Sequence, residues 1–203
     1  MVSALLAMPL AFGLAACADD YDPVVFIADG DTLIVDGVVD ERALHAFNEA
    51  IRQHPQTRSL TLAYVPGSAD DDANLILARM VRSMGLDTIV PEGGLVSSGG
   101  TDLFLAGVNR RLAPSACIGV HSWDDDELGE GADLPRSDPI HRDYLRYYDD
   151  IGIDPEFYWF TLTAASADGM HWMTPDELAR YDFGEVDGDG RSGRATNAYC
   201  DNL

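Results

Sequence analysis

Lysine is absent from this chain of 203 residues, so all 13 of its basic side chains are arginines. The phosphate-binding loop of P-loop nucleotidases, a Schiff-base enzyme and a serine–lysine hydrolase each require a lysine. The composition excludes all three. Positive charge is scarce as a whole, because 35 aspartates and glutamates leave a formal net charge of −22. A surface this acidic repels phosphate backbones and anionic lipid headgroups, and we expect no nucleic-acid partner.

Long hydrophobic runs are also lacking, apart from one at the start of the chain. Residues 1–16 carry no charge, but as a helix they rise about 24 Å, less than a bilayer core of about 30 Å. Their length suits the apolar region of a secretory signal. The run ends in Leu14-Ala15-Ala16-Cys17, which resembles a bacterial lipobox and implies cleavage before Cys17 and lipidation of its thiol. A plain secretory signal is the alternative. We expect a location in the bacterial cell envelope, with the lipid anchor as the only contact with the membrane.

Cysteine is rare, with three residues in the chain. If Cys17 carries lipid, Cys117 and Cys200 remain in an oxidising compartment, where disulfides form and persist. A bridge between them and two separate thiols both stay open, because the sequence does not supply the Cα separation that a disulfide needs.

The rest of the chain predicts one α/β domain over residues 24–183, after an acidic spacer at 17–23 and before a tail at 184–203. Apolar runs and their flanking turn residues predict strands at 24–28, 32–35, 59–65, 86–90, 95–98 and 116–121. Helical spacing predicts helices that begin at Asp40 and at 70–72, and others at 101–106, 139–151, 154–165 and after Thr174. Alternating strands and helices indicate a mostly parallel sheet with helices on its faces.

The segment Ser97-Ser98-Gly99-Gly100 is the strongest chemical signal. Its glycines allow a sharp turn between a strand and a helix, and the N–H groups at a helix start point towards any anion formed near the serine hydroxyl. It is not the motif of the α/β-hydrolase elbow, because neither serine has glycine both two residues before and two residues after it. Taken alone, such a segment is more often a tight turn than the site of a nucleophile.

The neighbours of Ser98 favour the nucleophile. Gly67 follows an earlier buried strand, Gly107 ends the helix after Ser98, and His121 ends a later strand. This arrangement resembles the Clp protease proteolytic subunit and its crotonase-fold relatives, most closely small predicted periplasmic Clp-protease-like proteins. The resemblance spans about 24–183, and its matching stretches are 62–68, 98–107, 110–121 and 172–181. It implies a crotonase-like superhelix of ββα units with a C-terminal helical segment.

The resemblance also implies roles for individual residues. Ser98 would be the nucleophile and His121 its general base. The N–H of Gly67 or Ser68, together with that of Gly99, would form the oxyanion hole. The family's aspartate falls where this chain has Met170, so Asp168, the nearest carboxylate, is the expected third member.

An α/β-hydrolase triad of Ser98, Asp168 and His171 fits less well, because the elbow motif is missing and His121 is better placed. His141 and His171 lack metal-ligand spacing. The run 187–190 lacks the ligand set of a calcium loop and indicates a solvated turn. We expect neither a metal nor a cofactor.

The favoured function is a secreted or lipid-anchored serine hydrolase, a peptidase acting on a peptide or a small ester or amide. The alternative is a catalytically inactive binding or scaffolding protein of the same fold. Acyl-CoA chemistry is disfavoured by the compartment and by the lack of any lysine for the cofactor's phosphates. Assembly into a homo-oligomer stays open.

Overall fold

The computed structural model describes residues 21–125, 127–186, 197–200 and 202. The expected signal, most of the spacer, Cys17 and the run 187–190 lie outside these residues. Within them, nine strands form one sheet: β1 (Val25–Asp29), β2 (Thr32–Asp36), β3 (Ser59–Val65), β4 (Asp87–Val90), β5 (Leu95–Ser97), β6 (Arg110–Leu112), β7 (Cys117–Val120), β10 (His171–Trp172) and β11 (Glu185–Val186). A separate small hairpin pairs β8 (Asp124–Asp125) with β9 (Gly129–Glu130).

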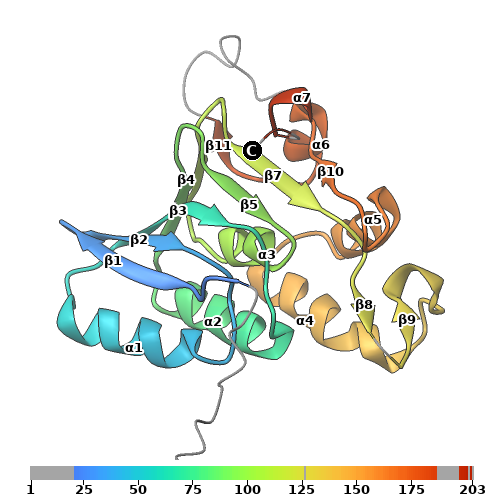
Figure 1. Ribbon diagram of the computed structural model, residues 1–203, viewed down its shortest axis with the longest axis horizontal. Helices are drawn as coiled ribbons and strands as arrows, with labels where there is room; N and C mark the ends of the chain where they lie inside the picture. Colours follow the sequence, from blue (N-terminus) through green and yellow to red (C-terminus); the bar gives the residue numbers. More distant parts are fainter. Residues whose placement is uncertain (1–20, 126, 187–196, 201, 203) are drawn as a thin grey trace, which may run out of the picture.

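The helices lie between these strands and after them. They are α1 (Ala43–Gln53), α2 (Asp71–Ser83), α3 (Gly99–Leu105), α4 (Arg142–Ile151), α5 (Glu156–Ala164), α6 (Pro175–Arg180) and α7 (Asn197–Cys200), with 3-10 turns η1 (Gly131–Asp133) and η2 (Pro139–His141). Helices α1 and α2 cover one face of the β1–β3 region, and the C-terminal helices gather beside β7 and β10 (Figure 1).

Strand β3 organises the sheet, because three parallel partners meet on it. Strand β2 runs along one edge, while β4 pairs with Ser59–Thr61 and β5 pairs with Tyr64 and Val65 on the other. The sheet therefore divides at β3 into an arm through β5 and β7 to β10 and an arm through β4 and β6 to β11. Two pairings within this sheet are antiparallel, that of β1 with β2 and that of β10 with β7, and the others are parallel. Strand β11 extends the sheet beyond residue 183, the expected end of the domain.

Apolar periodicity explains why these elements form. In β2 and β3 alternate residues such as Leu33, Leu60 and Leu62 are fully buried. Helix α1 buries Ala43, Phe47 and Ala50 at helical spacing, and the Phe47 ring packs 5.4 Å from that of Phe26 on β1. Burying these side chains is the main stabilising term of the fold.

Most predicted boundaries agree with the structure to within two residues. The predicted strand 59–65 is β3, and Asp70 caps α2 by accepting a hydrogen bond from the Ala73 N–H. The helix predicted after Thr174 is α6, and Thr174 and Glu177 form a capping box at its start. The sequence predicts a helix that begins at Asp40, and this boundary is wrong. The buried Asp40 carboxylate accepts hydrogen bonds from Arg42, and α1 begins after that arginine.

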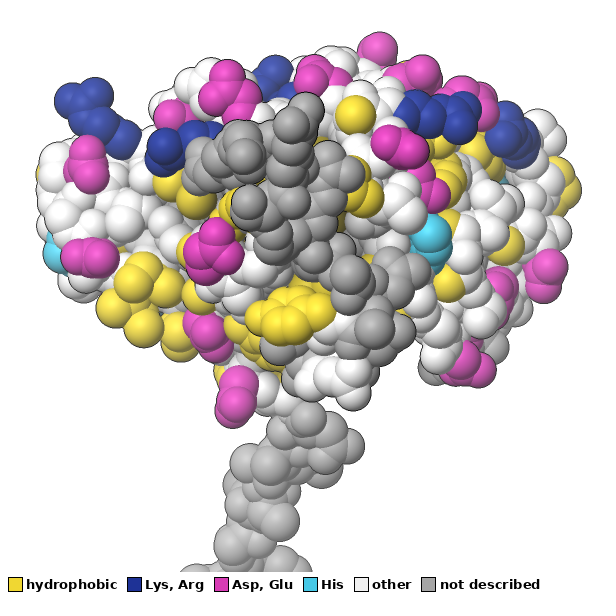
Figure 2. Space-filling model, turned by 90° about the horizontal axis from the view of Figure 1, so that it is seen from above, with side chains coloured by type: hydrophobic (Ala, Val, Ile, Leu, Met, Phe, Trp, Pro, Cys, Tyr) yellow, Lys and Arg dark blue, Asp and Glu magenta, His cyan; other side chains and the backbone are white. Residues whose placement is uncertain are grey.

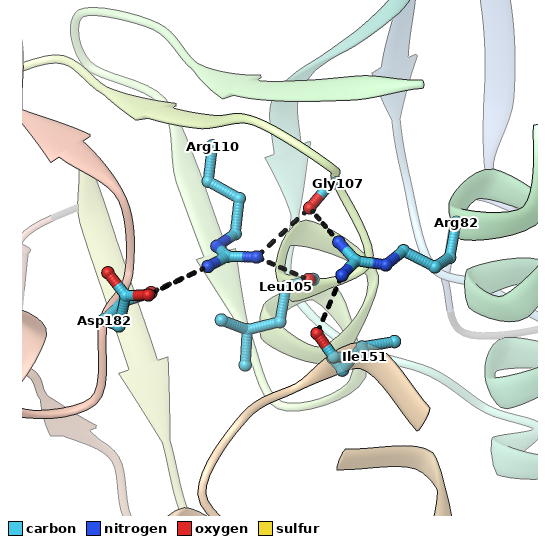
Figure 3. Close-up of polar contacts among 6 residues, drawn as sticks. All are labelled: Arg82, Leu105, Gly107, Arg110, Ile151 and Asp182. Carbon is cyan, nitrogen blue, oxygen red and sulfur yellow. Dashed lines mark hydrogen bonds and ion pairs between the residues drawn. The ribbon is translucent and has the colours of Figure 1, made fainter. Parts of the chain in front are cut away.

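Two arginines bind the C-terminal end of α3 (Figure 3). Arg82 of α2 donates to the carbonyls of Gly107 and Ile151, each at 3.0 Å. Arg110 donates to the Gly107 carbonyl at 3.1 Å and to the Asp182 carbonyl at 3.0 Å. Cations at this end of a helix satisfy its free carbonyls and favour its dipole. The contacts hold α3, which follows Ser98 directly, against four other segments.

The C-terminal segment is joined to the sheet by a disulfide between Cys117 of β7 and Cys200 of α7, with a Cα–Cα distance of 5.8 Å. The bridge packs on Leu95 at the start of β5. Among the described residues, no helix is long and apolar enough to cross a bilayer.

The face seen from above carries hydrophobic side chains on the β1–β2 side, and arginines along one edge of the view (Figure 2). Val25 and Ile27 are 47% and 55% exposed, because β1 lies at the end of the sheet and none of the described helices covers its outer face.

Candidate active site

The predicted site residues follow three neighbouring strands. Strands β3, β5 and β7 are adjacent and parallel, so their carboxyl ends meet at one edge of the sheet, where ligands of open α/β sheets bind. Gly67 follows β3, Ser98 follows β5 and His121 follows β7. The topology therefore brings together residues that the sequence keeps far apart.

Ser98 has a strained backbone. Its φ of 52° and ψ of −129° lie in a region that residues other than glycine rarely occupy, at a cost of about 1–3 kcal/mol. A serine held this way between a strand and a helix has the geometry of a nucleophile elbow, although the flanking glycine motif differs. Its N–H donates to the Gly119 carbonyl at 3.1 Å. A Cβ at Gly100 would lie 2.0 Å from the Val65 carbonyl oxygen, so only glycine allows α3 to start this close to β3.

The two serines of the motif have different roles. Ser97 is buried, and its hydroxyl donates to the Pro66 carbonyl at 2.8 Å, which ties β5 to the turn after β3. The Ser98 hydroxyl is half-buried and makes no hydrogen bond with any described residue. Of the two hydroxyls, only that of Ser98 is free to react.

The expected oxyanion-hole residues surround Ser98. A Cβ at Gly67 would lie 3.8 Å from the Ser98 Oγ, and one at Gly99 would lie 2.3 Å from the Ser68 Oγ. Within the described part of the chain, the N–H groups of Gly67, Ser68 and Gly99 donate no hydrogen bond. Three backbone donors beside the hydroxyl are therefore free to bind a developing negative charge.

His121 shares a cavity with Ser98, but no hydrogen bond joins their side chains. The His121 Nδ1 is buried without any partner among the described residues. Asp168 does not fill this position. It lies exposed in the turn between α5 and β10 and makes no hydrogen bond or ion pair within the described chain. The structure thus places a Ser98–His121 pair at the site, without the expected carboxylate.

Neither His171 nor His141 lines the cavity of Ser98. The His171 Nε2 lies 3.0 Å from the Glu177 Oε2. Burial acts to raise the pKa of Glu177, yet hydrogen bonds from Thr174 and His171 hold that pKa below its ordinary value. The triad of Ser98, Asp168 and His171 is therefore not assembled. His141 is fully buried, its Nδ1 lies 2.7 Å from the Tyr158 hydroxyl, and burial lowers its pKa. The described residues hold no group of three or more ligands arranged for a metal.

Sequence reasoning missed the acidic and aromatic lining of the cavity. Asp71 of α2 and Asp102 of α3 line it together with rings from α4 and α5. Burial raises the pKa of Asp102 to about 7; the hydrogen bond from Tyr148 opposes this rise, and the Asp71 charge adds to it. Asp102 stands one helical turn after Ser98 in an otherwise uncharged helix, and that signal could have identified it.

No protein-family model matches the chain, and no curated protein matches it in sequence. Its fold does match solved structures. A ClpP1 variant from Listeria monocytogenes aligns with a TM-score of 0.51 and 13% identity, over 80% of this chain and 94% of that one. An enoyl-CoA hydratase/isomerase family protein from Pseudomonas syringae aligns with a TM-score of 0.51 and 13% identity, over 84% and 78%. The 1510-N membrane protease specific for a stomatin homolog from Pyrococcus horikoshii aligns with a TM-score of 0.50 and 16% identity, over 75% and 70%.

These similarities show a fold like that of ClpP and the crotonases, and they confirm the predicted fold class. At such low identity they show the fold alone. The fold hosts both proteases and CoA enzymes, so the activity has to be argued from the residues of the site.

Proposed function

We propose that this protein is a serine hydrolase of the bacterial cell envelope, acting as a peptidase with Ser98 as nucleophile and His121 as general base. The observation that carries the proposal is the strained backbone of Ser98, which holds a free hydroxyl in the cavity that His121 also lines. Strain of this kind persists where the surrounding structure maintains it, and it clusters at functional sites.

In the proposed reaction, the Ser98 Oγ attacks the carbonyl carbon of an ester or amide while His121 takes the hydroxyl proton. The carbonyl oxygen becomes an oxyanion, which accepts hydrogen bonds from Gly99 and from Gly67 or Ser68. His121 then gives the proton to the leaving group, and a water molecule activated by the same imidazole hydrolyses the acyl-enzyme. Because the His121 Nδ1 lacks a carboxylate, the pair works as a dyad and is slower than a full triad.

Labelling with a fluorophosphonate probe tests the proposal, because the probe reacts covalently with an activated serine. We expect the wild type to be labelled, Ser98→Ala to lose the label completely and His121→Gln to lose most of it. Ser97→Ala is the matched control and should retain the label, since its hydroxyl is committed to the Pro66 carbonyl. A folded wild type that takes no label would contradict the hydrolase.

A non-catalytic binding protein of the same fold is the second candidate. It is favoured by the missing hydrogen bond between Ser98 and His121 and by the unpartnered Nδ1. For this function, neither Ser98→Ala nor His121→Gln should change any measurable turnover of ester or amide substrates.

The cell-envelope location rests on the first 17 residues. We propose lipidation at Cys17 after removal of residues 1–16. Cys17→Ser should abolish incorporation of radiolabelled palmitate and release the protein from membranes. Full incorporation in that variant would contradict the anchor.

A further inference from the structure

The candidate active site contains a carboxylate with a free oxygen. Asp102 is 8% exposed and lines the cavity beside Ser98. Its Oδ1 accepts a hydrogen bond from the Tyr148 hydroxyl, whereas its Oδ2 accepts none from any described residue. This oxygen is therefore free to accept a hydrogen bond from a group that enters the cavity.

A second carboxylate lies close to the first. Asp71 lines the same cavity, and its oxygens accept hydrogen bonds from the hydroxyls of Ser68 and Tyr144. Its charge is near enough to raise the pKa of Asp102. No arginine is among the residues that line the cavity, and His121 is the only basic side chain there. The two carboxylates therefore lack a permanent cation to balance them.

Aromatic rings line the same cavity as this acidic pair. The rings of Tyr144 and Tyr158 stack at 5.2 Å, and those of Tyr148 and Phe157 meet edge-on at 5.4 Å. All four line the cavity. Aromatic faces attract cations, and carboxylates combined with aromatic walls suit a positively charged group better than a neutral one.

The size of the cavity narrows the choice of cation. Its volume is about 40 Å³, which is room for about two or three water-sized groups. An ammonium on a methylene stem is compact and has three donors, whereas a guanidinium is a wide planar fork. The cavity favours the ammonium.

The cavity continues into a larger acidic groove of about 310 Å³, which shares Asp71, Trp123 and Tyr144 with it. Five further aspartates line this groove: Asp70, Asp72, Asp124, Asp125 and Asp143. Leu128 and Ile140 add exposed apolar surface to it, and it contains no basic side chain. Such a groove attracts an extended chain that is cationic and partly apolar.

We infer that the substrate carries a primary ammonium, of the kind found on a lysine side chain, which lies between Asp71 and Asp102 beside the bond that Ser98 attacks. This inference rests on the proposed function for the position of the scissile bond, but not for the binding of the ammonium. The substrate class is then a lysine-containing peptide whose flanking residues lie in the acidic groove.

Binding to the Ser98→Ala variant tests the ammonium site without any need for turnover. Isothermal titration would compare N-acetyl-lysine amide with N-acetyl-norleucine amide, which has the same carbon chain without the charge. We expect at least a tenfold preference for the lysine compound, and weaker binding of the arginine analogue. Equal binding of the lysine and norleucine compounds would overturn the inference.

Two neutralising variants locate the site. In the Ser98→Ala background, Asp102→Asn should reduce the preference to about twofold or less, because the amide keeps the shape but loses the charge. Asp149→Asn is the matched control: it removes the same charge from an exposed position of α4 that lines neither the cavity nor the groove, and should preserve the preference. If circular dichroism shows that Asp102→Asn does not fold, the preference for the lysine compound is measured with Asp71→Asn instead. A preference that survives both Asp102→Asn and Asp71→Asn would overturn the assignment of the site.

Separate readouts distinguish this inference from the proposed hydrolase. If the wild type reacts with fluorophosphonate but hydrolyses norleucine and lysine esters with equal kcat/KM, the proposed hydrolase is supported and the ammonium site is contradicted. If the protein binds the lysine compound selectively but does not react with the probe, the ammonium site is supported and the hydrolase is contradicted.

Discussion

Met170 directly precedes β10 and His121 directly follows β7, at the same end of the antiparallel pair that these strands form. The register pairs Val120 with His171 and Gly119 with Trp172, and continued by one step beyond these pairs it would bring His121 across from Met170. Directly opposed residues of an antiparallel pair project their side chains to the same face. The Met170 sulfur also lies 2.6 Å from where a Cβ on Gly119 would be. The chain therefore carries a thioether at the strand end next to His121, and a thioether is only a weak acceptor.

Met170→Asp should increase the reactivity of Ser98. The new carboxylate would accept a hydrogen bond from the buried Nδ1 of His121, hold the ring in one tautomer and stabilise the imidazolium that forms. We expect the rate of fluorophosphonate labelling to rise at least tenfold. Met170→Leu is the control for packing and should leave the rate unchanged. Asp168→Asn should also have little effect, because Asp168 is exposed and makes no contact with His121. A large loss in Asp168→Asn would restore that residue as the orienting carboxylate.

Replacing Ser98 by glycine should give a more stable protein than replacing it by alanine. Glycine adopts the positive φ of this position without the steric cost that a Cβ imposes. We expect the free energy of unfolding in urea to be about 1 kcal/mol higher for Ser98→Gly than for Ser98→Ala. At position 97 we expect the opposite: Ser97→Gly should be less stable than Ser97→Ala. Ser97 lies in a strand, where glycine costs about 0.5–1 kcal/mol of stability relative to alanine. Equal stability of the two Ser98 variants would mean that the strain is absent.

Asp102→Asn should change how stability depends on pH. Burial raises the folded-state pKa of Asp102 from 3.8 to about 7. Between these values the folded protein keeps a proton that the unfolded chain has released, so the free energy of unfolding falls as pH rises. The expected loss from this group is about 3 kcal/mol between pH 4 and pH 7. Asparagine does not titrate, so the free energy of unfolding of Asp102→Asn should not show this fall. Measured by urea unfolding, the stability of the variant relative to the wild type should therefore increase from pH 4 to pH 7. Parallel curves for the two proteins would contradict the raised pKa.

Cys200→Ser should destabilise the protein without disabling the site. The disulfide joins residues separated by 83 positions, and closing a loop of that size removes about 4.5 kcal/mol of chain entropy from the unfolded state. The bridge lies near the starts of β5 and β7, whereas Ser98 and His121 follow their ends. Urea unfolding should therefore shift strongly, while fluorophosphonate labelling of the folded variant stays near the wild-type rate. Wild type treated with dithiothreitol should reproduce the shift. Loss of labelling in a fully folded Cys200→Ser protein would show that α7 supports the site.

Local signals in the sequence determined much of the fold. The apolar run of β3 and the caps at Asp70 and Thr174 each depend on residues within one turn or one strand, so their physics is readable from neighbours in the chain. The strand–helix boundary at Ser98 is of the same kind, because the glycines that permit the sharp turn are adjacent to it. Asp40 shows the limit of such reasoning. Aspartate is a residue type that often begins a helix, but the Asp40 carboxylate binds Arg42, and α1 begins only after that arginine.

The tertiary structure alone decided the electrostatics of the site. Asp71 and Asp102 are on different helices, and the rings around them come from α4 and α5, so no local pattern brings them together. The pairing of β7 with β10 likewise brings Met170, rather than Asp168, to the strand end next to His121. Strand register depends on packing between distant segments, and a pKa depends on burial and nearby charges. Both properties arise only when the chain has folded, which is why the sequence pointed to Ser98 and His121 but not to the acidic cavity beside them.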